Sequence, residues 1–173
     1  MIARLLSTTL QRSKKSILLL GPRQTGKSTL IRGLHPDLTI NLAHEPTYLQ
    51  FARNPSELEE RLAAGAFRTV FLDEIQRLPS LLNTIQALLD ERRPIKFYLT
   101  GSSARKLKRG HANLLPGRLH TYHLGPLVAS ELAYRMDAVR ALETGTLPGL
   151  WTEEDARERR KTLQTYAATY LKE

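Results

Sequence analysis

A glycine-rich loop followed by lysine and serine is the segment of this chain whose residue types could do phosphate chemistry. Gly21 and Gly26 are separated by four residues, and Lys27 and Ser28 follow directly. Glycines let the backbone wrap closely enough for successive N–H groups to point at phosphate oxygens. The pattern predicts a nucleotide-binding loop whose contacting residues are Gly21, Pro22, Arg23, Gln24, Thr25, Gly26, Lys27, Ser28 and Thr29.

The lysine and the serine of this loop have separate predicted roles. Lys27 is expected to reach the β- and γ-phosphates of the nucleotide, where its charge offsets theirs. Ser28 is expected to place its hydroxyl on Mg²⁺, whose other ligands in such sites are mostly waters and phosphate oxygens. An apolar run from Ile17 to Leu20 predicts a buried strand before the loop, and a helix opens at Lys27. The phosphates would then lie at the positive end of a helix dipole.

Two neighbouring carboxylates follow a second apolar run at residues 69–72. Asp73 and Glu74 would therefore lie at the carboxyl end of a strand, where ligands of open α/β sheets bind. We expect Asp73 to hold Mg²⁺ through a water, and Glu74 to orient or deprotonate the water that attacks the γ-phosphate. A carboxylate placed to act as a base on water favours hydrolysis of the nucleotide over phosphate transfer to another acceptor. Adenine is the expected base, because the Asn-Lys-x-Asp pattern of guanine sites is absent from the sequence.

Small hydroxyl groups follow a third apolar run, from Lys96 to Leu99. Thr100 and Ser102 could hydrogen-bond the γ-phosphate or the attacking water. Simple turn chemistry would explain the same residue types equally well.

The elements that must position these residues are predicted from periodicity and from helix-capping signals. Further strands are expected at residues 39–42 and 120–124. Helices are expected at residues 2–11, from the cap Asn54 to Gly65, from Leu81 to the closing Arg92-Arg93-Pro94, and from the cap Ser130 to Gly145. A last helix is expected from Thr152 to the final residue, with an apolar face formed by Leu163, Tyr166, Ala167, Tyr170 and Leu171.

Length and composition indicate one globular domain with an appendage. The chain has 173 residues, and we expect an ATPase domain at residues 1–135 and a helical extension at 136–173. It contains no cysteine, so a disulfide framework is excluded and a reducing cytoplasm is the expected location. No apolar run approaches the roughly 20 residues of a membrane span, and no membrane contact is expected.

The formal charge of +9 suggests DNA as a partner. Cations gather at Arg12 to Lys15, at Arg105 to Arg109 and at Arg157 to Lys161. A solvated surface, together with cations that serve the nucleotide, would explain the same charge.

Five motifs together carry a resemblance to a known family. GPRQTGKST, FLDEIQ, YLTGSS, LPGR and LGPLVASEL occur here in the order and at the spacing typical of a large group of prokaryotic AAA-type ATP-binding proteins. The chain resembles that group from Ile2 to Ala133. The resemblance implies an α/β P-loop NTPase fold of the ASCE class, with a parallel central sheet flanked by helices. In that sheet the acidic strand lies apart from the phosphate-loop strand.

The resemblance also implies roles for residues outside the loop. Thr100 or Ser102 would correspond to a sensor at the end of the fourth strand, and Arg118 would be an arginine finger or a structural arginine. Members of the group usually continue into a C-terminal domain, and the last expected helix has no stop signal. We therefore expect a fragment or a truncated reading frame, with a missing domain or partner protein. The apolar face of that helix could instead join two copies in a homo-oligomer, with Arg118 acting in trans.

The sequence as a whole predicts a protein that binds ATP and hydrolyses it with Mg²⁺, in a regulatory or mechanochemical role. Two alternatives stay open. One is a nucleotide-dependent switch with little turnover, and the other is a DNA-binding regulatory ATPase.

Overall fold

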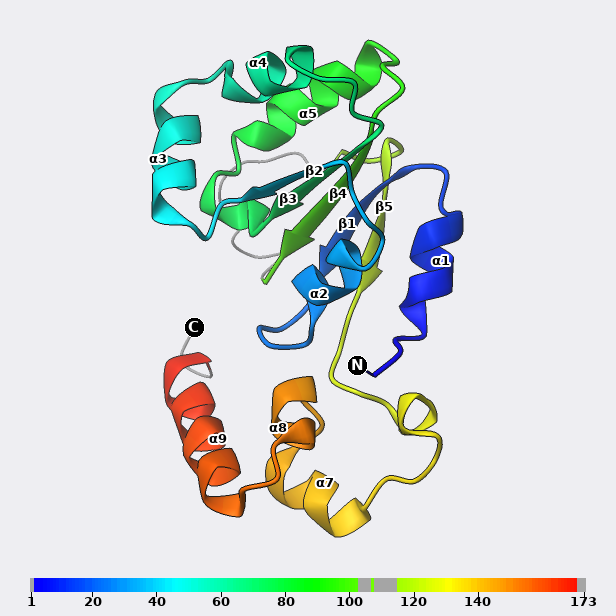
Figure 1. Ribbon diagram of the computed structural model, residues 1–173, viewed down its shortest axis with the longest axis vertical. Coiled ribbons are helices and arrows are strands. Elements are labelled where there is room, and N and C mark those ends of the chain that lie inside the picture. Colours follow the sequence, from blue (N-terminus) through cyan, green and yellow to red (C-terminus); the bar gives the residue numbers. More distant parts are fainter. Residues whose placement is uncertain (1, 103–106, 108–114, 171–173) are drawn as a thin grey trace.

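A five-stranded parallel sheet forms the centre of the molecule (Figure 1). The computed structural model describes residues 2–102, 107 and 115–170. The strand order is β2-β3-β4-β1-β5, and all neighbouring pairs are parallel. The strands are β1 Ser16–Leu20, β2 Leu38–Asn41, β3 Thr69–Asp73, β4 Lys96–Gly101 and β5 Leu119–His123. β4 separates the acidic strand β3 from the phosphate-loop strand β1, which confirms the predicted α/β P-loop arrangement.

The central strands are apolar throughout because both faces of the sheet are covered. Every residue of β1 is buried. Leu18 and Leu20 belong to a core beneath α3, α4 and α5, whereas Ile17 and Leu19 belong to a second core beneath α1 and α2. Figure 1 shows these two helical layers on opposite sides of the sheet. The helices are α1 Leu6–Arg12, α2 Lys27–Arg32, α3 Glu45–Arg53, α4 Glu57–Ala63 and α5 Leu81–Asp90.

The first helix and α3 depart from the predicted pattern. α1 begins at Leu6 rather than at Ile2, and Leu5 is 62% exposed. α3 was not predicted, because Phe51 is its one buried residue and a helix with so little apolar surface has a weak periodic signal. Asn54 lies between α3 and α4 and accepts from the Ser56 N–H at 3.1 Å, so it stabilises the turn rather than capping the helix as predicted.

The predicted helix from Ser130 to Gly145 is wrong. The chain forms a short 3₁₀ turn, η2 Ala129–Leu132, and then α7 Ala138–Thr144. Between them Ala133 and Tyr134 have φ angles of 51° and 57°, which a continuous helix cannot include. Asp137 caps α7, because its side chain accepts from two N–H groups of the first turn.

Two more helices complete the C-terminal part. α8 Pro148–Thr152 precedes α9 Ala156–Tyr170, so the last helix begins after the predicted Thr152. α7, α8 and α9 form a group beyond the carboxyl edge of the sheet (Figure 1), and the phosphate loop lies at that same edge. Within the described ranges no helix combines the length and the apolar composition that crossing a membrane requires.

Candidate functional site

The phosphate loop leaves the carboxyl end of β1 and enters α2 with backbone angles that favour glycine. Gly21 has φ 151° and Gly26 has φ 89°. A Cβ added to Gly21 would lie 2.1 Å from the carbonyl oxygen of Leu124, which follows β5. The Thr25 hydroxyl donates to the Pro22 carbonyl at 2.9 Å and closes the turn. The spacing of the two glycines is therefore required by the path of the loop.

We predict that Gly21→Ala destabilises the protein. The new methyl group meets backbone rather than a movable side chain. Overpacking of this kind costs about 1–3 kcal/mol, or a fall in melting temperature of about 2–12 °C for a chain of this size. Thermal unfolding followed by circular dichroism measures it. Gly125→Ala is the matched control, since a Cβ there has no atom within 4 Å. Equal melting temperatures for the two variants would contradict the prediction.

Lys27 lies inside the loop rather than in solvent. Its side chain is almost fully buried, and Nζ donates to the carbonyl oxygens of Gly21 at 2.8 Å and Pro22 at 2.7 Å. Burial lowers the pKa of Lys27, and this outweighs the opposite effect of the nearby Glu74 and Asp73 carboxylates. The loop thus holds an ammonium group at the concave surface where the sequence predicted phosphates.

Asp73 joins the phosphate-loop helix to the sheet. Its Oδ1 accepts from the Ser28 hydroxyl at 2.7 Å and from the Thr100 hydroxyl at 2.5 Å. Its Oδ2 lies 3.5 Å from the guanidinium of Arg32, a residue with no role predicted from the sequence. Asp73 is 4% exposed and Thr100 is fully buried. The structure therefore brings together the predicted metal-binding serine and aspartate, and their oxygen atoms suit a hard cation such as Mg²⁺.

The backbone leaves the extended conformation at Glu74, the residue directly after β3. Its φ of 60° is left-handed, an unusual conformation for a residue with a side chain. The Glu74 N–H donates to the Thr100 hydroxyl at 3.1 Å. Its carboxylate accepts from the Gln76 amide, which also donates to the Ser102 hydroxyl at 2.9 Å. Both predicted hydroxyl residues thus contact the acidic strand, one through the backbone of Glu74 and the other through Gln76.

Arg118 lies away from this site. It precedes β5, whose first residue pairs with Ser16 at the amino end of β1, so it lies at the edge opposite the loop. Its guanidinium makes two bonds to Asp90, at 2.6 and 3.0 Å. The hydrogen bond from Arg118 holds the pKa of Asp90 below its usual value. An intrachain pair is what the structure contains, and a role for Arg118 in a neighbouring subunit stays a prediction.

The loop residue Arg23 contacts the C-terminal helix instead of pointing at the phosphate position. Its guanidinium lies 4.9 Å from the ring centroid of Tyr170, and its carbonyl accepts from the Tyr166 hydroxyl at 3.4 Å. The Tyr166 and Tyr170 rings are 4.9 Å apart and half-buried. The apolar stripe expected on this helix is therefore partly covered by its own chain. Its last member, Leu171, lies outside the described residues, as does the expected basic cluster at 105–109 apart from Leu107.

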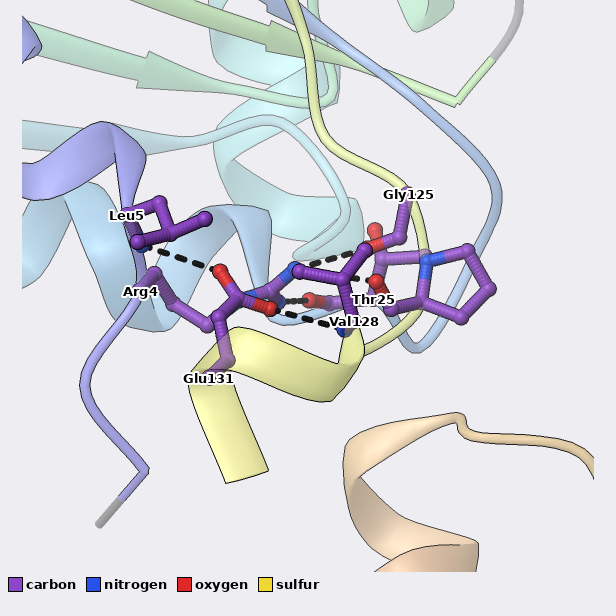
Figure 2. Close-up of polar contacts among 7 residues, drawn as sticks. Arg4, Leu5, Thr25, Gly125, Val128 and Glu131 are labelled. Carbon is purple, nitrogen blue, oxygen red and sulfur yellow. Dashed lines mark hydrogen bonds and ion pairs between the residues drawn. The ribbon is translucent and has the colours of Figure 1, made fainter. Parts of the chain in front are cut away.

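A half-buried arginine near the N-terminus contacts the loop (Figure 2). Arg4 donates to the carbonyls of Thr25 at 2.5 Å and Gly125 at 2.8 Å, and pairs with Glu131 at 3.0 Å. Burial alone would raise the pKa of Glu131, but bonds from the Leu5 N–H and Arg4 hold it below its usual value. Sequence reasoning missed Arg4, because no local motif marks a contact with a residue so distant in the chain.

A cavity of about 450 Å³ opens beside the loop. It lies between the N-terminal segment with α1, one face of α2, the segment after β5, and α8. Its lining includes Ile2, Arg4, Gly26, Thr29, Leu127 and Gly149. The cavity thus borders the phosphate loop at Gly26.

Comparisons with known proteins agree with this geometry. A family model described as an AAA domain matches residues 13–133. Two uncharacterized proteins, one of Mycobacterium tuberculosis and one of Mycobacterium bovis, are each 30% identical over 162 residues, covering 90% of this chain and 35% of theirs. The chain therefore spans about a third of the length of these curated relatives.

Solved structures share the fold. C. elegans PCH-2 matches 73% of this chain and 40% of its own, with a TM-score of 0.50 and 18% identity. A Pif1 helicase, from a structure concerned with unwinding of forked double-stranded DNA, matches 95% of this chain and 51% of its own, with a TM-score of 0.50 and 13% identity. At these identities the likeness concerns the fold alone.

Proposed function

The chain belongs to the AAA domain family, whose model spans residues 13–133, and from that premise we propose that it binds Mg·ATP at the phosphate loop and hydrolyses it. The observation that supports this most directly is the junction at the carboxyl edge of the sheet. There the buried carboxylate of Asp73 accepts from Ser28 of the phosphate-loop helix and from Thr100 of β4. A chance glycine loop would not be expected to come with this arrangement.

The binding part of the proposal assigns the ionic groups of the loop. Lys27 would exchange its two carbonyl acceptors for β- and γ-phosphate oxygens, which accept more strongly because they are charged. Ser28 and Asp73 would hold Mg²⁺, directly or through water, in place of their present hydrogen bond. Bound Mg²⁺ would supply positive charge to the oxygens of the phosphate that is transferred. Arg32 would keep the Asp73 carboxylate oriented during that exchange.

The hydrolytic part of the proposal rests on Glu74 as general base. The Glu74 N–H donates to the Thr100 hydroxyl, so the backbone that carries the carboxylate is anchored to β4. Gln76 occupies one carboxylate oxygen and links it to Ser102. The second oxygen would take the proton of the attacking water. Ser102 would then act by positioning Gln76, while Thr100 positions both acidic residues.

A base-binding role is proposed for the cavity beside the loop. It begins at Gly26 and Thr29, next to the expected phosphates, and Ile2, Leu30 and Leu127 offer apolar contacts for a purine ring. This proposal gives the N-terminal segment, which lines the cavity opposite α2, a contact with the nucleotide. It also gives α8 a contact with bound nucleotide through Gly149.

The nucleotide-dependent switch remains as a second candidate because two groups are engaged elsewhere. The Glu74 carboxylate is occupied by Gln76, and Arg23 stacks on α9. Arg23 would have to leave α9 before it could contact a phosphate, and the Gln76 bond leaves Glu74 only one free carboxylate oxygen. Such a chain would bind ATP and change conformation, and a further domain or partner would control its turnover.

Phosphate release from ATP tests the proposed function. We expect the purified chain to release phosphate with Mg·ATP, to stop when EDTA removes the metal, and to be inhibited by ADP more strongly than by GDP. Tight ATP binding without phosphate release would favour the switch. Release that persists in EDTA, or equal inhibition by both nucleotides, would contradict the metal and base assignments respectively.

A further inference from the structure

A basic cleft lies at the amino edge of the sheet, opposite the phosphate loop. Because the strands are parallel, their amino ends share one edge, and cations stand at or just before β3, β4, β1 and β5. The cleft has a volume of about 380 Å³. Within the described part of the chain its charged lining residues are all basic, namely Lys14, Lys15, Arg68, Arg93, Lys96 and Arg118.

Carboxylates nearby neutralise only part of this charge. Asp90 pairs with Arg118 and Glu91 pairs with Arg93, and neither acid lines the cleft. Asp37 also lies close, and accepts from the backbone N–H groups of residues 68 and 69. Three acids against six cations leave the edge positively charged, within the part of the chain that the structure describes.

Three of the four cleft cations that make no ion pair within the described residues are exposed, whereas Lys96 is half-buried and its Nζ donates to the carbonyl oxygens of Leu10 and Ser13. Lys14 and Arg68 are exposed. The Nζ of Lys15 donates to the carbonyl of Gly117 at 2.7 Å, which positions the ammonium but leaves its charge uncompensated. Such a concentration of one sign of charge in a concave surface raises the local potential and attracts anions.

The spacing of the cations indicates a polymeric anion. Neighbouring strands lie about 4.8 Å apart, so the three steps from β3 to β5 spread the cations over about 14 Å. Each strand of a duplex carries one phosphate per about 3.4 Å of helix axis, so a cation row of this length can contact more than one phosphate. The lining contains no aromatic side chain among the described residues, whereas sites for unpaired strands use aromatic rings on which bases stack.

We propose that this cleft binds the phosphate backbone of duplex nucleic acid without reading its sequence. The lining offers cations for phosphate contacts, two of its three arginines are paired with acids, and among the described residues it contains no Asn or Gln side chain that would recognise adenine. The cleft is separated from the nucleotide loop by the length of β1, about 16 Å for five residues. Duplex and ATP can therefore be bound at the same time. The proposal does not depend on ATP hydrolysis.

Binding of a labelled duplex of about 20 base pairs tests the proposal. Mg·ADP is kept at saturation so that the phosphate loop cannot serve as the anion site, and affinity is measured from about 50 to 200 mM salt. Each lost phosphate contact flattens the slope of log affinity against log salt by about 0.9. We expect the double variant Lys14→Ala, Arg68→Ala to flatten it by about 2.

Two matched variants give the experiment its contrast. The exchange Lys14→Arg, Arg68→Lys keeps both charges and should keep the slope. The variant Arg157→Ala, Arg160→Ala removes two exposed cations from α9 and should also keep it. ADP affinity, read at the opposite edge, should be equal in all variants and so shows that each is folded.

Several outcomes would overturn the proposal. They are no duplex binding at about 50 mM salt, where such contacts are strong, an unchanged slope in the double alanine variant, a loss confined to the α9 variant, and stronger binding of single strands than of duplex. Polyglutamate binding would also overturn it if the double alanine variant flattened its salt slope as much as that of the duplex. The cleft would then be a site for acidic protein segments.

Discussion

Lys27→Ala should lose ATP binding by at least about 100-fold while the sheet stays folded. The Lys27 ammonium already makes two hydrogen bonds inside the loop, and phosphate oxygens would take the place of those carbonyls. Hydrogen bonds to charged groups contribute about 1.5–3 kcal/mol each, so two of them correspond to about 10²–10⁴ in affinity. Titration calorimetry with ATP in the presence of Mg²⁺ measures the difference.

The lysine prediction has a control within the same chain. Lys14→Ala removes an exposed lysine at the opposite edge of the sheet and should leave ATP affinity unchanged. The far-ultraviolet circular dichroism of both variants should match that of the parent chain. Parent-like ATP affinity in Lys27→Ala would show that the phosphates do not lie at this loop.

Glu74→Gln should reduce phosphate release by about 10²–10⁴-fold, the contribution typical of a positioned general base. ATP affinity should change little, because glutamine keeps the shape of the side chain and the Glu74 backbone bond to Thr100 is unaffected. Single-turnover phosphate release with excess protein measures the chemical step apart from product release.

Glu91→Gln is the matched control for the glutamate prediction. Glu91 is an exposed acid whose described partner is Arg93 at the amino edge, so its loss should leave turnover unchanged. If Glu74→Gln turns over as fast as the parent chain, Glu74 is not the base. The engagement of its carboxylate by Gln76 would then be a structural contact, and the switch would become the better proposal.

The sequence predicted the centre of the fold well because its signals are local. The strand before Gly21 and the helix after Gly26 follow from neighbouring residues, as does the acidic end of β3. The resemblance supplied the strand order, which periodicity alone does not contain. The helix expected after Ser130 failed because the two left-handed residues at Ala133 and Tyr134 carry no glycine signal.

The parts of the site that the sequence did not predict are contacts between residues distant in the chain. Nothing near Arg23 indicates that it would stack on Tyr170. Gln76 belongs to a quoted motif, yet its bridge between Glu74 and Ser102 depends on the pairing of β3 with β4. Side-chain partners of this kind are fixed by tertiary packing, so they become visible only when the strands are in register.

The bond between Arg4 and Glu131 has a consequence for the order of events during synthesis. The two residues are 127 positions apart, so Arg4 leaves the ribosome long before its acidic partner does. Closing so long a segment is entropically costly until the intervening strands have brought its ends together. Arg4 therefore donates to the Thr25 carbonyl while it is also paired with Glu131 only after η2 has been translated. A nascent chain shorter than this can build the sheet, but it has not yet assembled the outer support of its phosphate loop.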